Sequence, residues 1–133
     1  MPQPQANMLA RRYIETLGAG HIDDCMALFA DDAVIKFPES IVRSRSLSKS
    51  EFAAMMKNAP NIFQVWPTYT VIDQISRGNR SCLEFTGVGR MKTGADFRNE
   101  YCIVFIAADG KIVEMREYLD TSALQSAAKP VMP

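Results

Sequence analysis

The chain has 133 residues, enough for one domain with a single hydrophobic core. Apolar residues make up 47% and charged residues 23%, proportions that are typical of a globular protein and not of a disordered one. Fifteen basic and fifteen acidic residues give a formal net charge of zero, which argues against the basic face that nucleic-acid binding requires. We expect one domain over residues 1–133, with flexible tails at 1–5 and 128–133.

Cysteine usage and the N-terminus bear on the compartment. Cys25, Cys82 and Cys102 are far apart and odd in number, so they indicate neither a disulfide framework nor a zinc site. The polar, proline-bearing N-terminus lacks the apolar segment of a signal peptide, and no apolar run is long enough to cross a bilayer. We therefore expect a protein of the reducing cytoplasm with no membrane, nucleic-acid or metal partner.

Helical periodicity marks the first half of the chain. Leu9, Tyr13 and Leu17 recur at the spacing of one helix face. Ser48 and Glu51 have the S-x-x-E spacing of a capping box, which favours a helix start. The predicted helices span residues 6–17, 22–29 and 49–57, with a strand at 33–37 and a loop at 40–47 between the second and third.

The second half of the chain changes to a period of two. Four strands are predicted, and Asp109-Gly110 is the strongest two-residue hairpin signal. Helices followed by an antiparallel meander predict an α+β fold. The predicted strands span residues 68–76, 81–91, 97–107 and 112–119.

One acidic residue on the last predicted strand stands out. Side chains alternate along a strand, so Glu117 shares a face with Val113, Met115 and Leu119 and is the only charge on it. If that face lines the interior, desolvation raises the pKa of Glu117 and gives a carboxyl group able to move protons near neutral pH. The alternative is that Glu117 pairs with an arginine or reaches solvent at the strand end.

Neighbouring strands are expected to add polar groups to the same interior. Glu84 would point inward together with Cys82, and Tyr101 would point inward together with Asn99. A mostly apolar wall with a few convergent polar groups is typical of a ligand pocket. A register error of one residue would invert either set. For Asn99 and Tyr101 the alternative is a buried hydrogen bond that fixes the strands.

Several segments match a known family. Residues 10–15 (ARRYIE), 20–24 (GHIDD) and 28–33 (LFADDA) resemble the opening of bacterial steroid delta-isomerases. Residues 109–112 (DGKI) and 117–120 (EYLD) resemble the close of SnoaL-like proteins and of limonene epoxide hydrolase. The chain thus resembles the SnoaL-like branch of the nuclear transport factor 2-like fold. The resemblance implies three N-terminal helices packed on a strongly curved antiparallel sheet, a central pocket, and a homodimer formed through the outer sheet face.

The functional residues of that family transfer unevenly. Tyr13 matches the isomerase tyrosine that donates a hydrogen bond to the developing enolate. Phe37 stands where the isomerase has its aspartate base, and Cys102 lies near the place of its protonated aspartate. Glu117 matches the last-strand acid of the epoxide hydrolase, but Glu84 stands where that enzyme has an arginine. In SnoaL-type cyclases an acid on the closing strands transfers the proton, a part that suits Glu117 better than Asp120.

Two functions follow from these observations. The first is a cofactor-independent enzyme that isomerises, cyclises or dehydrates a small apolar carbonyl compound. Glu117 would be its acid/base and Tyr13 and Tyr101 its oxyanion donors. The second is a small-molecule-binding or dimerisation module without chemistry, motivated by Phe37 where a base is expected. In either case the residues expected to contact the ligand are Glu84, Asn99, Tyr101, Phe37, Met115, Leu119 and Trp66, although packing alone would explain Trp66.

Overall fold

The computed structural model describes residues 5–38 and 46–120, in which two strands lie between the second and third helices and four longer strands follow the third helix. This order confirms the predicted α+β class. The elements are α1 (Gln5–Gly18), α2 (Ile22–Met26), β1 (Phe29–Lys36), β2 (Ser46–Ser48), α3 (Lys49–Asn58), a 3-10 turn (Ala59–Asn61), β3 (Phe63–Arg77), β4 (Arg80–Met91), β5 (Asp96–Ala108) and β6 (Lys111–Leu119).

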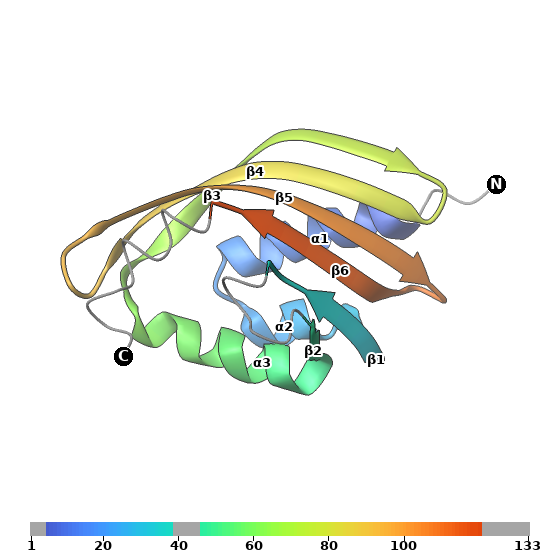
Figure 1. Ribbon diagram of the computed structural model, residues 1–133, viewed down its shortest axis with the longest axis horizontal. Helices are drawn as coiled ribbons and strands as arrows, with labels where there is room; N and C mark the ends of the chain where they lie inside the picture. The colour runs from blue at the N-terminus through green and yellow to red at the C-terminus, as the bar shows by residue number, and fades with distance from the viewer. Residues whose placement is uncertain (1–4, 39–45, 121–133) are drawn as a thin grey trace.

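One six-stranded sheet organises the fold, in the order β2-β1-β6-β5-β4-β3. All its pairings are antiparallel except the one between β1 and β6, which is parallel. The sheet curves strongly, and the helices lie on its concave side (Figure 1). Helix α1 contacts β3, β4, β5 and β6, whereas α3 contacts β1 and β2. The curved sheet with three helices over it confirms the predicted architecture.

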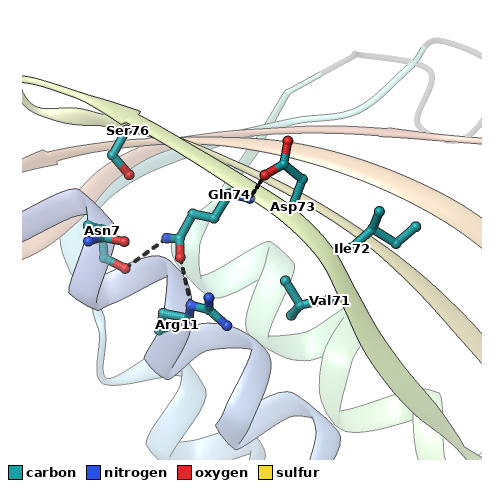
Figure 2. A pocket seen from close by; sticks show the side chains of 7 residues that line it. All are labelled: Asn7, Arg11, Val71, Ile72, Asp73, Gln74 and Ser76. Atoms are coloured by element: carbon teal, nitrogen blue, oxygen red, sulfur yellow. Dashed lines mark hydrogen bonds between the residues drawn. The ribbon is translucent and has the colours of Figure 1, made fainter.

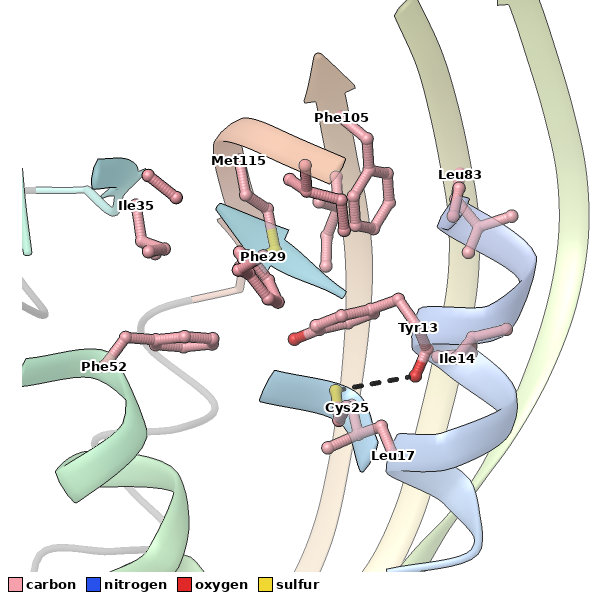
Figure 3. Packing of buried hydrophobic residues seen from close by; sticks show 14 of the residues in the cluster. Tyr13, Ile14, Leu17, Cys25, Phe29, Ile35, Phe52, Leu83, Phe105 and Met115 are labelled. Carbon is pink, nitrogen blue, oxygen red and sulfur yellow. Dashed lines mark hydrogen bonds between the residues drawn. The ribbon is translucent and has the colours of Figure 1, made fainter. Parts of the chain in front are cut away.

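The main core fills the space between α1 and the concave face of the sheet. Tyr13 lies at its centre, with ring centroids 5.2 Å from Phe105 and 6.0 Å from Phe29 (Figure 3). Burial of such aromatic side chains is a large apolar contribution to stability. Phe52 brings α3 into the same cluster through Phe29, at 5.8 Å.

Element boundaries differ from the prediction where packing overrides local pattern. The second helix ends at Met26, and Phe29 opens β1 because it is buried and pairs with Ile112 of β6. Strand β3 begins at Phe63 and runs through Pro67. The strand lies at the sheet edge, so the missing proline N–H removes no bond to a second neighbour.

A register irregularity changes one face of β6. Ile106 pairs with Glu114 and Ala107 with Ile112, so Val113 is the extra residue of a bulge. Ile112 is therefore fully buried while Val113 is partly exposed. The prediction that Val113 shares the inner face was wrong, because the strict alternation begins only after the bulge.

Some predictions fall outside the described residues. The expected tail at 128–133, most of the tail at 1–5 and most of the loop at 40–47 are among them. Gln5, expected in the tail, opens α1, and its side chain accepts a hydrogen bond from the Gly110 N–H at 2.8 Å. Within residues 5–38 and 46–120, no helix has the length and apolar character needed to span a bilayer. The homodimer stays a prediction.

The capping box of α3 is present as predicted. The Glu51 N–H donates to Ser48 Oγ at 3.2 Å, and the Ser48 N–H donates to Glu51 Oε1 at 2.9 Å. These two bonds satisfy amide groups that have no partner within the helix. The hydrogen bonds to Glu51 also hold its pKa below the usual value.

Removal of the Ser48 hydroxyl should destabilise the protein. We expect Ser48→Ala to lower the free energy of unfolding by about 1 kcal/mol, the usual effect of losing an N-cap acceptor. Urea unfolding followed by circular dichroism measures the change. Ser48→Asp is the matched control, because it restores a side-chain acceptor and should stay close to wild type. Equal stability of the alanine variant and wild type would contradict a stabilising cap.

Candidate functional site

Glu117 lies on the concave face of β6, surrounded by apolar side chains. Met115 and Leu119 flank it on the strand, and Ile103 is its partner on β5. On the β1 side, the register pairs Lys36 with Arg116. The next residues along the two strands are the buried Phe37 and Glu117, which therefore lie at the same level. Within residues 5–38 and 46–120, no basic side chain pairs with this carboxyl group.

This surrounding changes the acidity of Glu117. Burial raises its pKa from 4.5 to about 8, because the apolar environment disfavours the charged form. The side chain as a whole is only partly buried by surface area. Both observations fit a carboxyl group that is crowded by apolar atoms but still reachable by water. At neutral pH the group is therefore mainly protonated and can release its proton close to physiological pH.

Three tyrosines from different elements gather near Glu117. Tyr13 comes from α1, Tyr69 from β3 and Tyr101 from β5. Burial raises the pKa of each phenol, and the charge of Glu117 raises it further. All three rings are therefore close enough to Glu117 for its charge to affect them. With raised pKa values, all three phenols stay protonated and act as hydrogen-bond donors.

The polar atoms of this group are unpaired. Among residues 5–38 and 46–120, neither the Glu117 carboxylate nor the hydroxyl groups of Tyr13, Tyr69 and Tyr101 take part in a side-chain hydrogen bond or ion pair. No fully enclosed side-chain nitrogen or oxygen of the described residues lacks a partner. The four groups therefore each keep some accessible surface. An acid and three donors with open hydrogen-bonding capacity are what a polar ligand atom needs.

A glycine on β4 makes room for two of the tyrosine rings. Gly87 pairs with Tyr69 on β3, and a Cβ atom at Gly87 would lie 2.8 Å from Tyr69 Cε1 and 3.2 Å from Tyr101 Cε1. The Tyr69 and Tyr101 rings meet over this position with centroids 6.1 Å apart, and Phe85 stacks on Tyr101 at 4.7 Å. The Gly87 position thus sets where both phenols stand.

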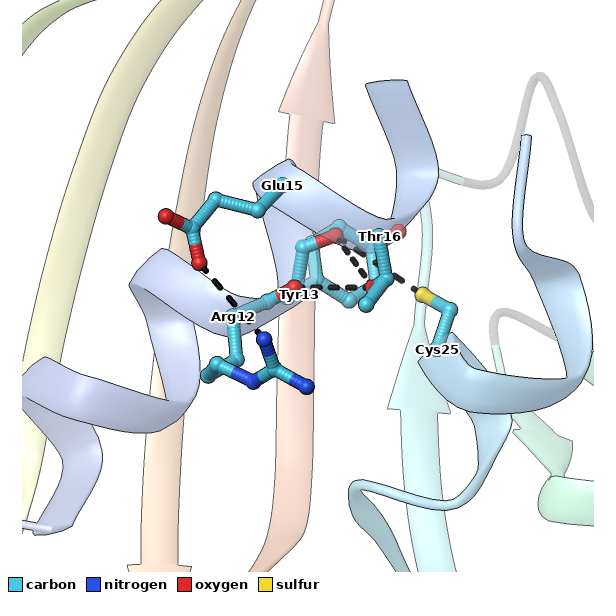
Figure 4. Close-up of polar contacts among 5 residues, drawn as sticks. All are labelled: Arg12, Tyr13, Glu15, Thr16 and Cys25. Atoms are coloured by element: carbon cyan, nitrogen blue, oxygen red, sulfur yellow. Dashed lines mark hydrogen bonds and ion pairs between the residues drawn. The ribbon is translucent and has the colours of Figure 1, made fainter. Parts of the chain in front are cut away.

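Contacts between α1 and α2 hold the backbone of Tyr13 (Figure 4). The Tyr13 carbonyl accepts a hydrogen bond from Thr16 Oγ1 at 3.1 Å and from Cys25 Sγ at 3.8 Å. The Cys25 thiol is buried, and burial raises its pKa to about 11, so it stays a neutral donor. These contacts fix the turn of α1 from which the phenol reaches the sheet.

Asn99 is buried, but its amide is used within the protein. Its Nδ2 donates to the Asp120 carbonyl at 3.2 Å, and its Oδ1 accepts from the backbone N–H groups of Asp120 at 2.9 Å and Glu100 at 2.8 Å. These bonds join β5 to the chain that leaves β6, which favours the structural alternative for Asn99. The Asp120 side chain is exposed at the strand end.

The prediction that Glu84 points inward was wrong. Leu83 and Phe85 are buried on β4, whereas Glu84 is exposed on the convex face. The reason lies in the register, since Phe85 pairs with Tyr101 and paired residues share a face. Tyr101 and Glu84 could not both point inward. Glu84 therefore plays no part in the Glu117 site.

The apolar candidates lie in or against the main core. Phe37 and Met115 are buried, and Leu119 packs against the cluster from the inner face of β6. Trp66 also packs against it, with its indole N–H donating to the Leu17 carbonyl at 2.8 Å. That bond joins β3 to the end of α1, so Trp66 has a structural role in packing, the alternative to ligand contact.

A cavity of about 490 Å³ lies away from Glu117, between α1 and β3 (Figure 2). Gln74 bridges its walls by accepting from Arg11 Nε at 2.6 Å and donating to the Asn7 carbonyl at 3.1 Å. These bonds give the groove a structural role in docking α1 on the sheet. The central pocket expected beside Glu117 stays a prediction. In the part of the chain that the structure describes, no three His, Cys, Asp or Glu side chains gather as metal ligands would.

Tyr69 was missed by sequence reasoning. Its strand was predicted to begin at Thr68, and no face was assigned to it. The useful signal was Gly87 in the interior of the neighbouring strand, since a strand glycine often marks the close approach of another group. Locating that group required the β3–β4 register, which pairs Tyr69 with Gly87.

Comparisons with known proteins agree with this fold. Residues 10–115 match the family model described as a SnoaL-like domain. Among solved structures, a proposed isomerase from Bacillus subtilis has a TM-score of 0.82 at 21% identity, covering 94% of this chain and 93% of that one. PrhC from Penicillium brasilianum has a TM-score of 0.82 at 14% identity, with 96% and 87% covered. AclR, a proposed hydroxylase from Streptomyces galilaeus, has a TM-score of 0.78 at 14% identity, with 95% and 96% covered.

No curated protein matches the chain in sequence. At these identities the solved structures carry the fold alone, and their reactions differ among themselves. The family match spans most of the chain, from within α1 to Met115 in the middle of β6, and ends before Glu117. The protein belongs to the family of SnoaL-like domains.

Proposed function

We propose that this protein is a cofactor-independent enzyme that transfers a proton within a small, mainly apolar carbonyl compound. The observation that carries the proposal is the unpaired Glu117, whose pKa burial raises to about 8, beside three unpaired phenols. A carboxyl group that titrates near the working pH can both accept and return a proton. Neighbouring donors that stay protonated can stabilise the oxyanion formed in between.

The proposed reaction needs one acid/base group. The Glu117 carboxylate removes a proton from a carbon next to the substrate carbonyl, and the electron pair moves onto the carbonyl oxygen to form an enolate. Tyr13, Tyr69 or Tyr101 donates a hydrogen bond to that oxygen. In a substrate with a C=C bond conjugated to the enolate, the protonated Glu117 then gives the proton to the far carbon of that bond, the double bond shifts, the carbonyl re-forms and the carboxylate is restored.

The surroundings of Glu117 define the substrate class. Ile103, Met115 and Leu119 offer apolar contact on the sheet, and Phe37 continues it toward β1. Among the residues that the structure describes, no basic side chain of this face is available to bind a carboxylate or phosphate. The ligand is therefore expected to be neutral and apolar, with one carbonyl oxygen directed at the phenols.

A non-catalytic binding role is the second candidate, and Phe37 favours it. Phe37 is buried with its ring 6.0 Å from Phe52 and supplies no second acid or base beside Glu117. A single carboxyl group suffices for binding a carbonyl oxygen when it is protonated. The two candidates differ in one measurable property, the exchange of substrate carbon-bound hydrogen with solvent.

Replacing Glu117 should abolish proton transfer but keep ligand binding. A panel of small cyclic ketones is screened by thermal shift, because binding to the folded state raises apparent stability. Deuterium uptake next to the carbonyl is then followed by NMR in heavy water. We expect wild type to catalyse uptake and Glu117→Gln to be slower by about 100-fold or more, with binding changed only a few-fold.

Glu84→Gln is the matched control for this experiment, because the same change is made on the exposed face of β4. It should leave uptake and binding unchanged. Binding without deuterium uptake by wild type would support the binding module over the enzyme. A wild-type protein that binds none of the ketones would overturn both roles for this class of ligand.

The Tyr13 hydroxyl should contribute to rate and not to structure. Tyr13→Phe keeps the ring contacts with Phe105 and Phe29 and removes only the donor. We expect deuterium uptake to fall by about 10- to 1000-fold, the range for loss of one oxyanion donor. Thermal unfolding should stay close to wild type, since no described residue pairs with this hydroxyl. An unchanged uptake rate would exclude Tyr13 from the oxyanion site.

The raised pKa of Glu117 also predicts a pH dependence of stability. Between pH 4.5 and about 8 the folded protein holds a proton that the unfolded chain has lost, so stability falls as pH rises through this window. Glu117→Gln stays neutral throughout. The free energy of unfolding of the variant should match that of wild type at pH 5 and exceed it at pH 9 by on the order of 2–4 kcal/mol. One pKa unit corresponds to about 1.4 kcal/mol, and water that reaches the carboxyl group reduces the energy calculated from the full pKa shift.

Urea unfolding at both pH values measures this difference. Glu84→Gln again serves as the control and should not alter the change in stability between pH 5 and pH 9. The prediction concerns the difference in free energy of unfolding between Glu117→Gln and wild type. If this difference does not grow from pH 5 to pH 9, Glu117 is not desolvated in the fold.

A further inference from the structure

Two cysteines form a close pair on the convex face of the sheet. Cys82 of β4 and Cys102 of β5 have their Sγ atoms 3.0 Å apart, and both thiols are free and partly accessible. In the register Cys82 pairs with Val104 and Cys102 with Glu84, so the two cysteines are diagonal neighbours across adjacent strands. Their side chains lean toward each other over this diagonal.

We propose that Cys82 and Cys102 form an oxidation site, at which a hydroperoxide converts the two thiols into an intrachain disulfide that thiols can reduce again. The distance carries the inference, because the sulfurs need to approach by only about 1 Å to reach bonding distance. The pair lies on the face opposite to Glu117, so the proposal does not depend on the enzymatic role.

The oxidation balances with one molecule of hydrogen peroxide. The thiolate of one cysteine attacks a peroxide oxygen, the O–O bond breaks, and the released hydroxide takes up a proton to leave as water. The resulting sulfenic acid is attacked by the second sulfur after that thiol loses its proton. The S–S bond forms, the S–O bond breaks, and a second water leaves. The two sulfurs together give up two electrons, which the peroxide accepts.

The surroundings of the pair set its reactivity. Burial, followed by the hydrogen bond and charge of Cys102, raises the pKa of Cys82 to about 11. Its thiol is therefore mainly neutral at pH 7, and reaction should accelerate as the pH rises. Diagonal strand neighbours lie about 7–8 Å apart, slightly beyond the backbone separation that a disulfide spans without strain, so the strands must shift toward each other as the bond forms. A strained bond of this kind is easily reduced, which makes the site reversible.

The disulfide would form on the convex face and affect side chains on the concave face. Cys102 is adjacent in sequence to Tyr101, and Cys82 to the buried Leu83, whose side chains lie on the inner face of the same strands. Drawing β4 and β5 together at this diagonal should shift the Tyr101 ring and its stacking on Phe85. A change in the near-ultraviolet circular dichroism of the oxidised protein would report this shift.

Cys25 provides an internal comparison. It is buried in the main core, and burial raises its pKa to about 11. Its sulfur bonds to the Tyr13 carbonyl and not to a second thiol. In the folded protein it should remain reduced under conditions that oxidise the surface pair.

The test uses the purified, fully reduced protein and hydrogen peroxide. After exposure, the protein is denatured, remaining thiols are alkylated, and trypsin digestion is followed by mass spectrometry. Cleavage at arginine and lysine places Cys82 in peptide 81–90, Cys102 in 99–111 and Cys25 in 13–36. We expect peptides 81–90 and 99–111 to be linked with the loss of two hydrogens, and peptide 13–36 to be alkylated. Oxidation should be at least tenfold faster at pH 9 than at pH 7, and dithiothreitol should reverse it.

Three cysteine-to-serine variants show whether the link forms specifically between Cys82 and Cys102. Cys82→Ser and Cys102→Ser should each prevent the linked peptide, whereas Cys25→Ser should retain it.

The experiment is run at a protein concentration where light scattering gives a monomer, because the predicted homodimer would cover the convex face. Unfolding wild type in urea before oxidation should remove the preference for this pair. Free thiols after oxidation, sulfinic acids in place of a link, or links only between chains would overturn the proposal.

Discussion

The β5–β6 register places a carboxyl group opposite Ile103 and between Met115 and Leu119, and no basic side chain of residues 5–38 and 46–120 pairs with it. Ionisation at such a position is costly, since no partner replaces the water that burial removes. Burial therefore raises the pKa of Glu117 to about 8, and the proposed proton transfer depends on this shift. Had an arginine stood nearby, the same carboxylate would be permanently charged and would serve as part of an ion pair.

The tyrosines around Glu117 depend on how the strands pack against α1. Tyr69 and Tyr101 reach the same place because Gly87 leaves the space that a side chain would fill. Tyr13 reaches it from the helix, held by ring contacts and by the bond from Cys25 to its carbonyl. Residues from the first helix and from four strands thus contribute to the proposed site, which is why no short motif in the sequence describes it.

The fold could be predicted from the sequence largely because its signals are local. The capping box at Ser48 and Glu51 and the turn at Asp109-Gly110 depend on neighbouring residues only, and the α+β order followed from the change in period. The inner face of β6 was predicted correctly from Met115 onward, since strict alternation holds there. Strand pairing decided the rest: the bulge at Val113 shifted one face, and the pairing of Phe85 with Tyr101 excluded Glu84.

The parallel pairing of β1 with β6 has a consequence for how the chain reaches this structure. It joins the first strand to the last, with Lys36 beside Arg116, while the remaining main ladders connect strands that follow one another. The hairpins of β3 to β6 can form from local contacts, but the β1 edge can be added only after nearly the whole chain is available. Closing such a long loop is slow, because the chain loses conformational entropy before the stabilising contacts between β1 and β6 form. Newly synthesised protein should therefore expose the β6 edge, and with it Glu117, until the N-terminal segment docks.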